Sequence, residues 1–163
     1  LMHNVKALID SRVAKILVEK PAAVSIDELV ENREYLIKAD TKVYVAYNRR
    51  FYASVQEVKK IIEEDGGLLS MSFEFTEWAH RIEAIDKPQI IKNNWFFANS
   101  THVVDLAFYL AGKPERWSTY AQTGSITWHP VSNFSGAGVT NRNVVFSYLS
   151  NWESAGRWGV ELL

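Results

Sequence analysis

The sequence of 163 residues contains no cysteine, so it can form neither a disulfide framework nor a cysteine-based metal site. A lack of cysteine is typical of proteins in the reducing cytoplasm, and we expect the protein to reside there. The net charge is −1 and no basic block occurs, so we expect neither nucleic acid nor a membrane as a partner. No apolar run is long enough to span a membrane, and the N-terminus lacks the pattern of a signal peptide.

The residues that are present suit one globular domain, since 47% are hydrophobic and 23% are charged. Six of them are tryptophan, whose rings pack in cores and interfaces and also stack on sugar rings. The chain begins at Leu1 and ends in the strand-like stretch Val160–Leu163, with no turn signal after it. We therefore expect a piece of a longer protein, truncated within its last domain.

The N-terminal stretch alternates between helix and strand patterns. Residues 2–10 have a helical apolar stripe, and residues 14–18 form a short apolar run of the kind found in buried parallel strands. Glu19-Lys20-Pro21 follows this run directly. Such a pattern is typical of the closing piece of a doubly wound α/β unit, in which ligands bind beyond the carboxyl ends of the strands.

The chain then changes from helices to strands. Ser25 followed by Glu28 is a capping box that predicts the start of a helix. Met71, Phe73 and Phe75 alternate with polar residues and predict a strand with one polar face. The other expected elements are helices at 25–38 and 53–64, strands at 42–47, 68–76, 116–128, 142–151 and 156–163, a loop at 78–94 and a linker at 132–140. This order predicts an α+β domain, with one sheet and helices on one of its faces.

One further helix carries the candidate chemistry. Residues 99–101 can all cap a helix N-terminus, and Gly112 can end the helix that follows. The apolar body of this helix carries His102 in its first turn and Asp105 one turn later. Titratable groups are costly to bury unless they are paired. By itself this pattern favours a hydrogen-bonded core histidine, but motifs elsewhere in the chain favour a functional one.

Three local motifs carry a resemblance to a known family. They are Glu19-Lys20-Pro21 at the end of one strand, Asn48-Arg49-Arg50-Phe51 at the end of the next, and Trp95 with Ser100-x-His102-x-x-Asp105-Leu106 and Tyr109-Leu110-x-Gly112-Lys113-Pro114. In this order they make the chain resemble the Gfo/Idh/MocA superfamily of glucose–fructose oxidoreductases, inositol dehydrogenases and rhizopine-catabolism enzymes. The resemblance covers most of the chain.

The resemblance implies a fold and a division of the chain. Residues 1–21 would be a remnant of the end of a doubly wound Rossmann domain that binds a dinucleotide. Residues 22–163 would be the substrate-binding and dimerisation domain, an open, mostly antiparallel sheet with helices on one face, like the C-terminal domain of glyceraldehyde-3-phosphate dehydrogenase. Members of the family commonly pair through the open sheet face, so a homo-oligomer is also implied.

The resemblance further implies an activity and the residues for it. The parent enzyme would oxidise a hydroxyl group of a sugar, an inositol or a sugar nucleotide to a ketone, or catalyse the reverse reaction, with NAD or NADP. Lys20 and His102 would be catalytic, and Glu19-Lys20-Pro21 would contact the cofactor. The substrate would be bound by a larger group of residues, namely Asn48, Arg49, Arg50, Trp95 and Asn99.

The chemistry of this reaction suits those residue types. A hydroxyl group that loses hydride needs a base, and imidazole titrates near neutral pH. The ammonium group of Lys20 would stabilise the alkoxide that develops. A helix N-terminus beside His102 would lower the pKa of the imidazole and keep it ready to accept a proton.

Two departures from the family pattern bear on the activity. The family usually has an aspartate four residues before the histidine, where this chain has Ala98, followed by Asn99. No G-x-G-x-x-G motif occurs, so the residues that hold the cofactor pyrophosphate would lie upstream of Leu1. We therefore expect the substrate domain of a longer enzyme, inactive by itself. The alternative is a non-catalytic carbohydrate-binding or assembly module that kept the sheet and lost the chemistry.

Other candidate residues have competing interpretations. Arg49 and Arg50 form either an anion clamp or a structural turn that pairs with carboxylates. His80, with Glu77, could touch a substrate but is more typical of an exposed loop, and His129 lies in a predicted turn. The histidines are too scattered in the sequence to predict a metal site.

Overall fold

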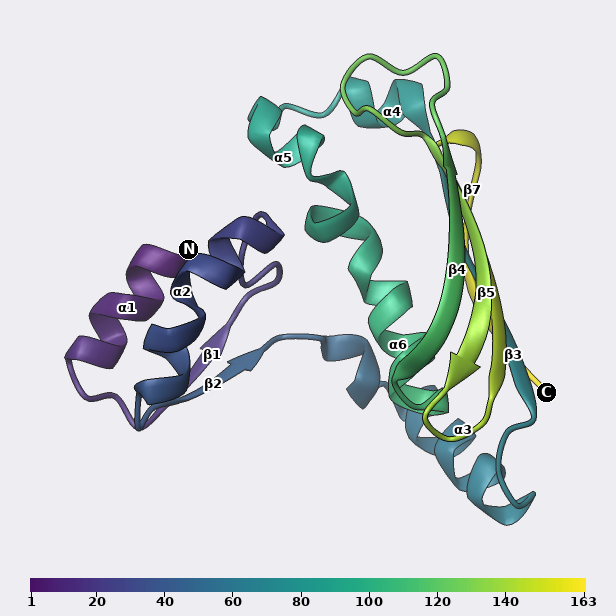
Figure 1. Ribbon diagram of the computed structural model, residues 1–163, viewed down its shortest axis with the longest axis horizontal. Helices are drawn as coiled ribbons and strands as arrows, with labels where there is room; N and C mark the ends of the chain where they lie inside the picture. The colour runs from purple at the N-terminus through teal and green to yellow at the C-terminus, as the bar shows by residue number, and fades with distance from the viewer.

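The computed structural model describes residues 1–163, which form two parts connected after the second strand (Figure 1). The first part consists of α1 (Met2–Asp10), β1 (Lys15–Val18), α2 (Ile26–Lys38) and β2 (Lys42–Val45). The two strands pair in parallel, with Ile16 opposite Val43. The division of the chain at residue 21 stays a prediction, and this two-stranded sheet continues past it to Val45.

Local sequence explains how the first part is built. The alternate residues Ile16 and Val18 of β1 are buried and pack with α1 in a small core. At the start of α2, the Ser25 hydroxyl accepts a hydrogen bond of 3.2 Å from the Glu28 backbone N–H. The Glu28 carboxylate in turn accepts one of 2.7 Å from the backbone N–H of Val24. The predicted capping box is thus present, with its return bond displaced by one residue.

The second part is a five-stranded sheet with helices on one face (Figure 1). Its elements are η1 (Asn48–Phe51), α3 (Ala53–Glu64), β3 (Ser70–Trp78), α4 (Ala79–Glu83), α5 (Gln89–Asn93), η2 (Phe96–Ser100), α6 (Thr101–Ala111), β4 (Pro114–Gln122), β5 (Asn133–Thr140), β6 (Val145–Asn151) and β7 (Glu153–Leu162). The strand order is β4-β5-β6-β3-β7, and only β3 and β6 are parallel neighbours. The predicted α+β class, with an open and mostly antiparallel sheet, is confirmed. No helix is both long and apolar enough to cross a membrane.

The main core lies between the sheet and α6. The period-two pattern of β3 buries Met71, Phe73 and Phe75 on the helix face, as the sequence predicts. Val103 and Ala107 of α6 pack against them in one cluster of buried side chains. Residues of β3 on the other face, which carries no helix, are polar. This packing fixes α6, and with it His102, relative to the strand ends.

The strands after α6 differ from the prediction. The linker expected at 132–140 is wrong, because β5 occupies residues 133–140 between β4 and β6. Glycines are typical of linkers, but here they permit close packing. A Cβ atom at Gly138 would lie 2.2 Å from the backbone oxygen of Arg116, and one at Gly136 would lie 2.6 Å from the Tyr148 ring. The strand expected at 116–128 is shorter than predicted at its C-terminal end, since β4 ends at Gln122 before a loop.

The approach to α6 also differs from the prediction. The loop expected at 78–94 contains α4 and α5, and the chain then runs through the π-helical turn η2 directly into α6. Residues 99–101 therefore do not cap a free N-terminus, and the Thr101 hydroxyl donates a hydrogen bond of 3.1 Å to the backbone oxygen of Phe97. The expected end is correct, since Gly112 follows α6 with φ of +94°, a conformation that suits glycine.

Candidate active site

Lys20 lies at the carboxyl end of β1 and reaches across to η2. Its ammonium group donates hydrogen bonds to the backbone oxygens of Ala98 and, at 3.3 Å, of Asn99. Burial lowers the pKa of Lys20 from its ordinary value, and the positive charge of Arg49 lowers it further. The carboxylate of Glu77 acts in the opposite direction. Lys20 is therefore a positioned cation at the junction of the two parts, and not a solvated strand-end lysine.

His102 lies on α6 beside this junction. Burial lowers its pKa from its ordinary value, and the charges of Lys20 and Arg49 lower it further, while Asp105 opposes the shift. The ring of Tyr47 stands edge-on to the imidazole, with 6.1 Å between ring centroids. The Nδ1 atom is buried and has no hydrogen-bond partner within the protein. These surroundings keep the ring neutral at physiological pH, so it is able to accept a proton.

The cause of the lowered pKa of His102 differs from the expected one. The sequence predicts that a helix N-terminus lies beside the imidazole, but the π-helical turn η2 precedes α6 and continues the helical path. The shift comes instead from burial and from Lys20 and Arg49, which lie far away in the sequence. The expected direction is right, and its predicted origin is wrong.

Glu77 has contacts in this site that the sequence does not predict, because its one expected role is a substrate contact together with His80. It lies near the end of β3, at a register shift between Thr76 and Trp78. Its two carboxylate oxygens accept separate hydrogen bonds, at 3.1 Å from the Trp95 indole N–H and at 2.8 Å from the Asn99 side chain. Burial raises the pKa of Glu77, while these two bonds and the charge of Lys20 lower it.

The residues expected to bind substrate divide into two groups. Trp95 and Asn99 meet at Glu77, and Arg49 stacks on the Trp158 ring, with 4.9 Å from the guanidinium carbon to the ring centroid. Each of these three residues lies beside the Lys20 and His102 site. Asn48 and Arg50 do not join them.

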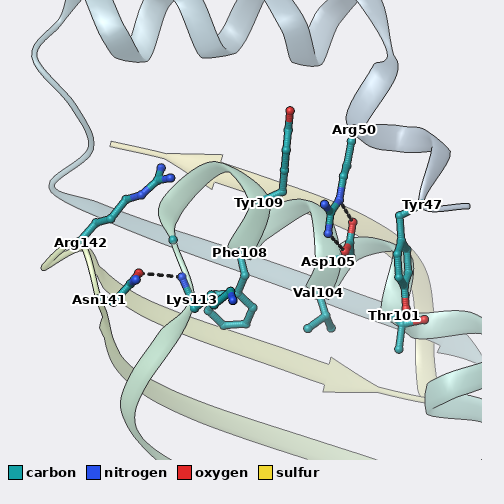
Figure 2. A pocket seen from close by; sticks show the side chains of 11 residues that line it. Tyr47, Arg50, Thr101, Val104, Asp105, Phe108, Tyr109, Lys113, Asn141 and Arg142 are labelled. Atoms are coloured by element: carbon teal, nitrogen blue, oxygen red, sulfur yellow. Dashed lines mark hydrogen bonds and ion pairs between the residues drawn. The ribbon is translucent and has the colours of Figure 1, made fainter. Parts of the chain in front are cut away.

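Asn48 is exposed at the start of η1. Arg50 forms a two-pronged ion pair with Asp105, in which Nε donates to Oδ2 at 2.7 Å (Figure 2). Arg50 thus matches the structural alternative for the two arginines, a turn that pairs with a carboxylate. The pair lines a cavity of about 500 Å³ along α6, shared with Tyr109 and Arg142 (Figure 2).

A second cavity, of about 520 Å³, lies beside Glu77. It is lined by Thr76, Glu77, Trp78, Arg81, Ile82, Ile85, Ala155, Gly156 and Trp158. Gly156 keeps this space open, because a Cβ atom there would meet nothing closer than the backbone oxygen of Thr76 at 3.7 Å. The volume is within the range of small-molecule sites, and the two indole rings offer flat apolar surfaces.

The remaining histidines lie apart from this site. His80 is exposed and stacks on Trp78, with 5.5 Å between ring centroids. His129 packs edge-on to Trp152 at 4.8 Å within an aromatic cluster under the loop after β4. No group of three or more histidine, aspartate or glutamate side chains is arranged to hold a metal ion.

Comparison with solved structures finds proteins that share this fold. An oxidoreductase from Thermotoga maritima superposes with a TM-score of 0.78 at 17% identity, over 99% of this chain and 52% of that one. The WlbA dehydrogenase from Thermus thermophilus, solved with NAD and α-ketoglutarate, gives 0.72 at 12% identity, over 98% of this chain and 53% of that one. Myo-inositol 2-dehydrogenase from Lactobacillus plantarum gives a TM-score of 0.70 at 15% identity, over 95% of this chain and 49% of that one. No protein-family model and no curated protein sequence matches the chain.

These matches define a class of fold. The chain has the fold of the C-terminal half of Gfo/Idh/MocA oxidoreductases, and the resemblance inferred from the three motifs is confirmed at that level. The chain spans about half the length of these relatives. At such low identity the fold is what the comparison establishes, and chemistry has to be argued from the site itself.

Proposed function

We propose that the chain is the substrate domain of an NAD(P)-dependent oxidoreductase that acts on a hydroxyl group of a sugar, an inositol or a sugar nucleotide. One observation carries the proposal. Lys20, from the first part of the fold, donates hydrogen bonds to the backbone oxygens of Ala98 and Asn99 just before His102, and its charge lowers the pKa of the imidazole. A cation beside a neutral base is the pair that alcohol oxidation requires.

Each residue of the pair has a distinct task. His102 accepts the proton of the substrate hydroxyl. Lys20 donates a hydrogen bond to the same oxygen and stabilises the negative charge that develops there. In the reverse direction, His102 returns the proton to that oxygen. The backbone oxygens of Ala98 and Asn99 hold the lysine in place for this task.

The chain holds only one end of a cofactor site. When bound, a nicotinamide cofactor supplies the acceptor for hydride, and WlbA was solved with NAD. Glu19, Lys20 and Pro21 follow β1 at the carboxyl edge of the parallel pair, where dinucleotides bind in doubly wound sheets. These residues suit the nicotinamide end, whereas the G-x-G-x-x-G motif for the pyrophosphate is not among the 163 residues.

The cavity beside Glu77 is suited to the substrate. Its walls include the indole rings of Trp78 and Trp158, whose apolar surface a sugar ring can pack against beside the stacked Arg81 and Arg49. Glu77 and Arg81 add polar groups at its edge, which are able to bond to hydroxyls. A polyhydroxylated ring needs this combination of flat and polar surfaces.

A non-catalytic carbohydrate-binding or assembly module is the second candidate. It is favoured by Ala98, which offers no carboxylate where the family usually has one. Titration of the parent protein with NAD(H) and NADP(H) separates the two candidates. Binding of either nucleotide supports the oxidoreductase, and sugar binding without any nucleotide binding supports the module.

Pairing through the open sheet face is part of the proposal. Tyr120, Val145 and Leu149 are exposed large side chains on β4 and β6, and by strand register they share the face that no helix covers. Burial of such side chains against a second copy would be favourable. Sedimentation of the protein over a range of concentrations tests this, and the cytoplasm as its compartment stays a prediction.

Substitution of the proposed base tests the enzyme assignment. We expect His102→Ala to lower the turnover of the parent enzyme by about 10²- to 10⁴-fold, the usual contribution of general acid–base catalysis. His3→Ala is the matched control, because His3 is exposed on α1 and is not among the residues assigned to the site. Equal turnover in the two variants would contradict the assignment of His102 as the base.

A further inference from the structure

We propose that Glu77, near the end of β3, positions Lys20 for the reaction through Asn99. This inference rests on the function proposed above, because it assigns a role within the same site. Glu77 is a positioning residue here, since it acts on Lys20 and Asn99 and not on the reacting hydroxyl.

The contacts form a continuous path between the two charged groups. Oε2 of Glu77 accepts a hydrogen bond of 2.8 Å from the side-chain amide of Asn99. The backbone oxygen of the same Asn99 accepts one of 3.3 Å from the ammonium group of Lys20. Oε1 of Glu77 is held separately at 3.1 Å by the indole N–H of Trp95. With both oxygens bonded, the carboxylate is fixed in place, and it fixes η2 beneath the lysine.

Glu77 has to be a carboxylate to make both of its hydrogen bonds. Trp95 and Asn99 donate to separate oxygens of Glu77, and a glutamine would offer one oxygen only, because its amide nitrogen donates. Burial raises the pKa of Glu77 and so disfavours the ionised form. The charge of Lys20 acts in the opposite direction and favours the ionised form, so the lysine and the carboxylate support each other.

Lys20 faces charges from every element around it. Arg49 of η1 repels its ammonium charge, and burial disfavours that charge further. Glu77 on β3 and Glu19, directly after β1, favour this charge, and Glu77 is the stronger of the two. His102 on α6 is also coupled to the lysine. Removal of Glu77 would leave the cation opposed by Arg49 and balanced by Glu19 alone.

Glu77 reaches η2 from the sheet. The register shift near Trp78 allows the end of β3 to depart from regular pairing. Ala98 of η2 also contacts Lys20 through its backbone oxygen, but its methyl group brings no charge to the ammonium.

Nuclear magnetic resonance of the lysine side chains tests this assignment without any turnover. In the unmodified chain we expect the signals of Lys20 to shift twice, once with its own titration and once at lower pH, when Glu77 takes up a proton. In Glu77→Gln we expect the low-pH shift to shrink to the part that Glu19 contributes, and the pKa of Lys20 to fall. Glu74→Gln is the matched control, because Glu74 lies on the same strand but pairs with Arg157 on the open face.

A second variant breaks the path at Asn99 and keeps the carboxylate. We expect Asn99→Ala, which removes the side-chain amide that donates to Glu77, to weaken the effect of Glu77 on Lys20. A Lys20 pKa that is the same in the unmodified chain and in Glu77→Gln would overturn the proposal. A single Lys20 transition in the unmodified chain would overturn the whole proposal, whether or not any variant folds. None of these results depends on the cofactor or the substrate, so they leave the proposed oxidoreductase function to its own test.

Discussion

The side-chain amide of Asn99 donates a hydrogen bond of 2.8 Å to Oε2 of Glu77 and thereby joins the π-helical turn η2 to the end of β3. Lys20 donates a hydrogen bond of 3.3 Å to the backbone oxygen of the same asparagine. Three segments far apart in the sequence thus converge on one residue. The π-turn supports this geometry, since π-helical turns are frequent at functional sites and allow a side chain to depart from regular α-helical spacing.

Arg49 should control the proton affinity of His102. Its positive charge lowers the pKa of the imidazole, after burial and Lys20. We expect Arg49→Gln to raise the pKa of His102 and so to move the acidic limb of kcat/KM to higher pH. Titration of the histidine ring protons measures the shift directly. Arg81→Gln is the control, because Arg81 stacks on Trp78 and does not act on His102. An unchanged His102 pKa in Arg49→Gln would contradict the prediction.

The lowered pKa of His102 makes the free energy of unfolding depend on pH. The folded-state pKa of His102 lies below its ordinary value of 6.5, so the unfolded chain takes up a proton first as pH falls. The stability that this group contributes is complete above about pH 6.5 and is lost as pH falls through the folded-state pKa. His129 shifts in the same direction, so the slope should weaken in His102→Gln and persist in part. Denaturant unfolding at several pH values measures this slope of the free energy of unfolding against pH.

The sequence predicts the parts of this molecule that depend on local patterns. The alternation of Met71, Phe73 and Phe75 predicts the face of β3 that is buried, because strand side chains alternate. The Glu-Lys-Pro motif predicts that Lys20 stands beyond a strand end. Glu77 escapes prediction because its role depends on a register shift and on a partner on another element, neither of which has a local signature. The glycines of β5 mislead for the same reason, since the rings that cover them come from neighbouring strands.

The ion pair of Arg50 and Asp105 should contribute to stability. Asp105 keeps 12% of its side-chain area exposed and Arg50 keeps 37%, so loss of Asp105 leaves a partly exposed charge without its partner. We expect Asp105→Asn to lower the free energy of unfolding by about 1–3 kcal/mol, below the cost for fully buried pairs because Arg50 is partly solvated. Glu34→Gln, in a pair with Lys38 that is 77% and 81% exposed, should cost less than about 0.5 kcal/mol. Denaturant unfolding measures both losses, and an equal loss of unfolding free energy in the two variants would contradict the expected difference.

The cavity beside Glu77 should lose its ligand when Gly156 acquires a side chain. No heavy atom beyond the neighbouring residues lies within 3.7 Å of a Cβ atom at this position, so Gly156→Val fits the strand while its methyl groups enter the cavity. We expect the KM of the parent enzyme for a polyol such as myo-inositol to rise about 10-fold or more, the usual effect of a volume change of this size in a pocket. Gly159→Val is the control on the same strand, because Gly159 pairs with Glu74 on the opposite face and also has room for a Cβ atom. Steady-state kinetics of the two variants measures the difference, and an equal KM in both would place the substrate elsewhere.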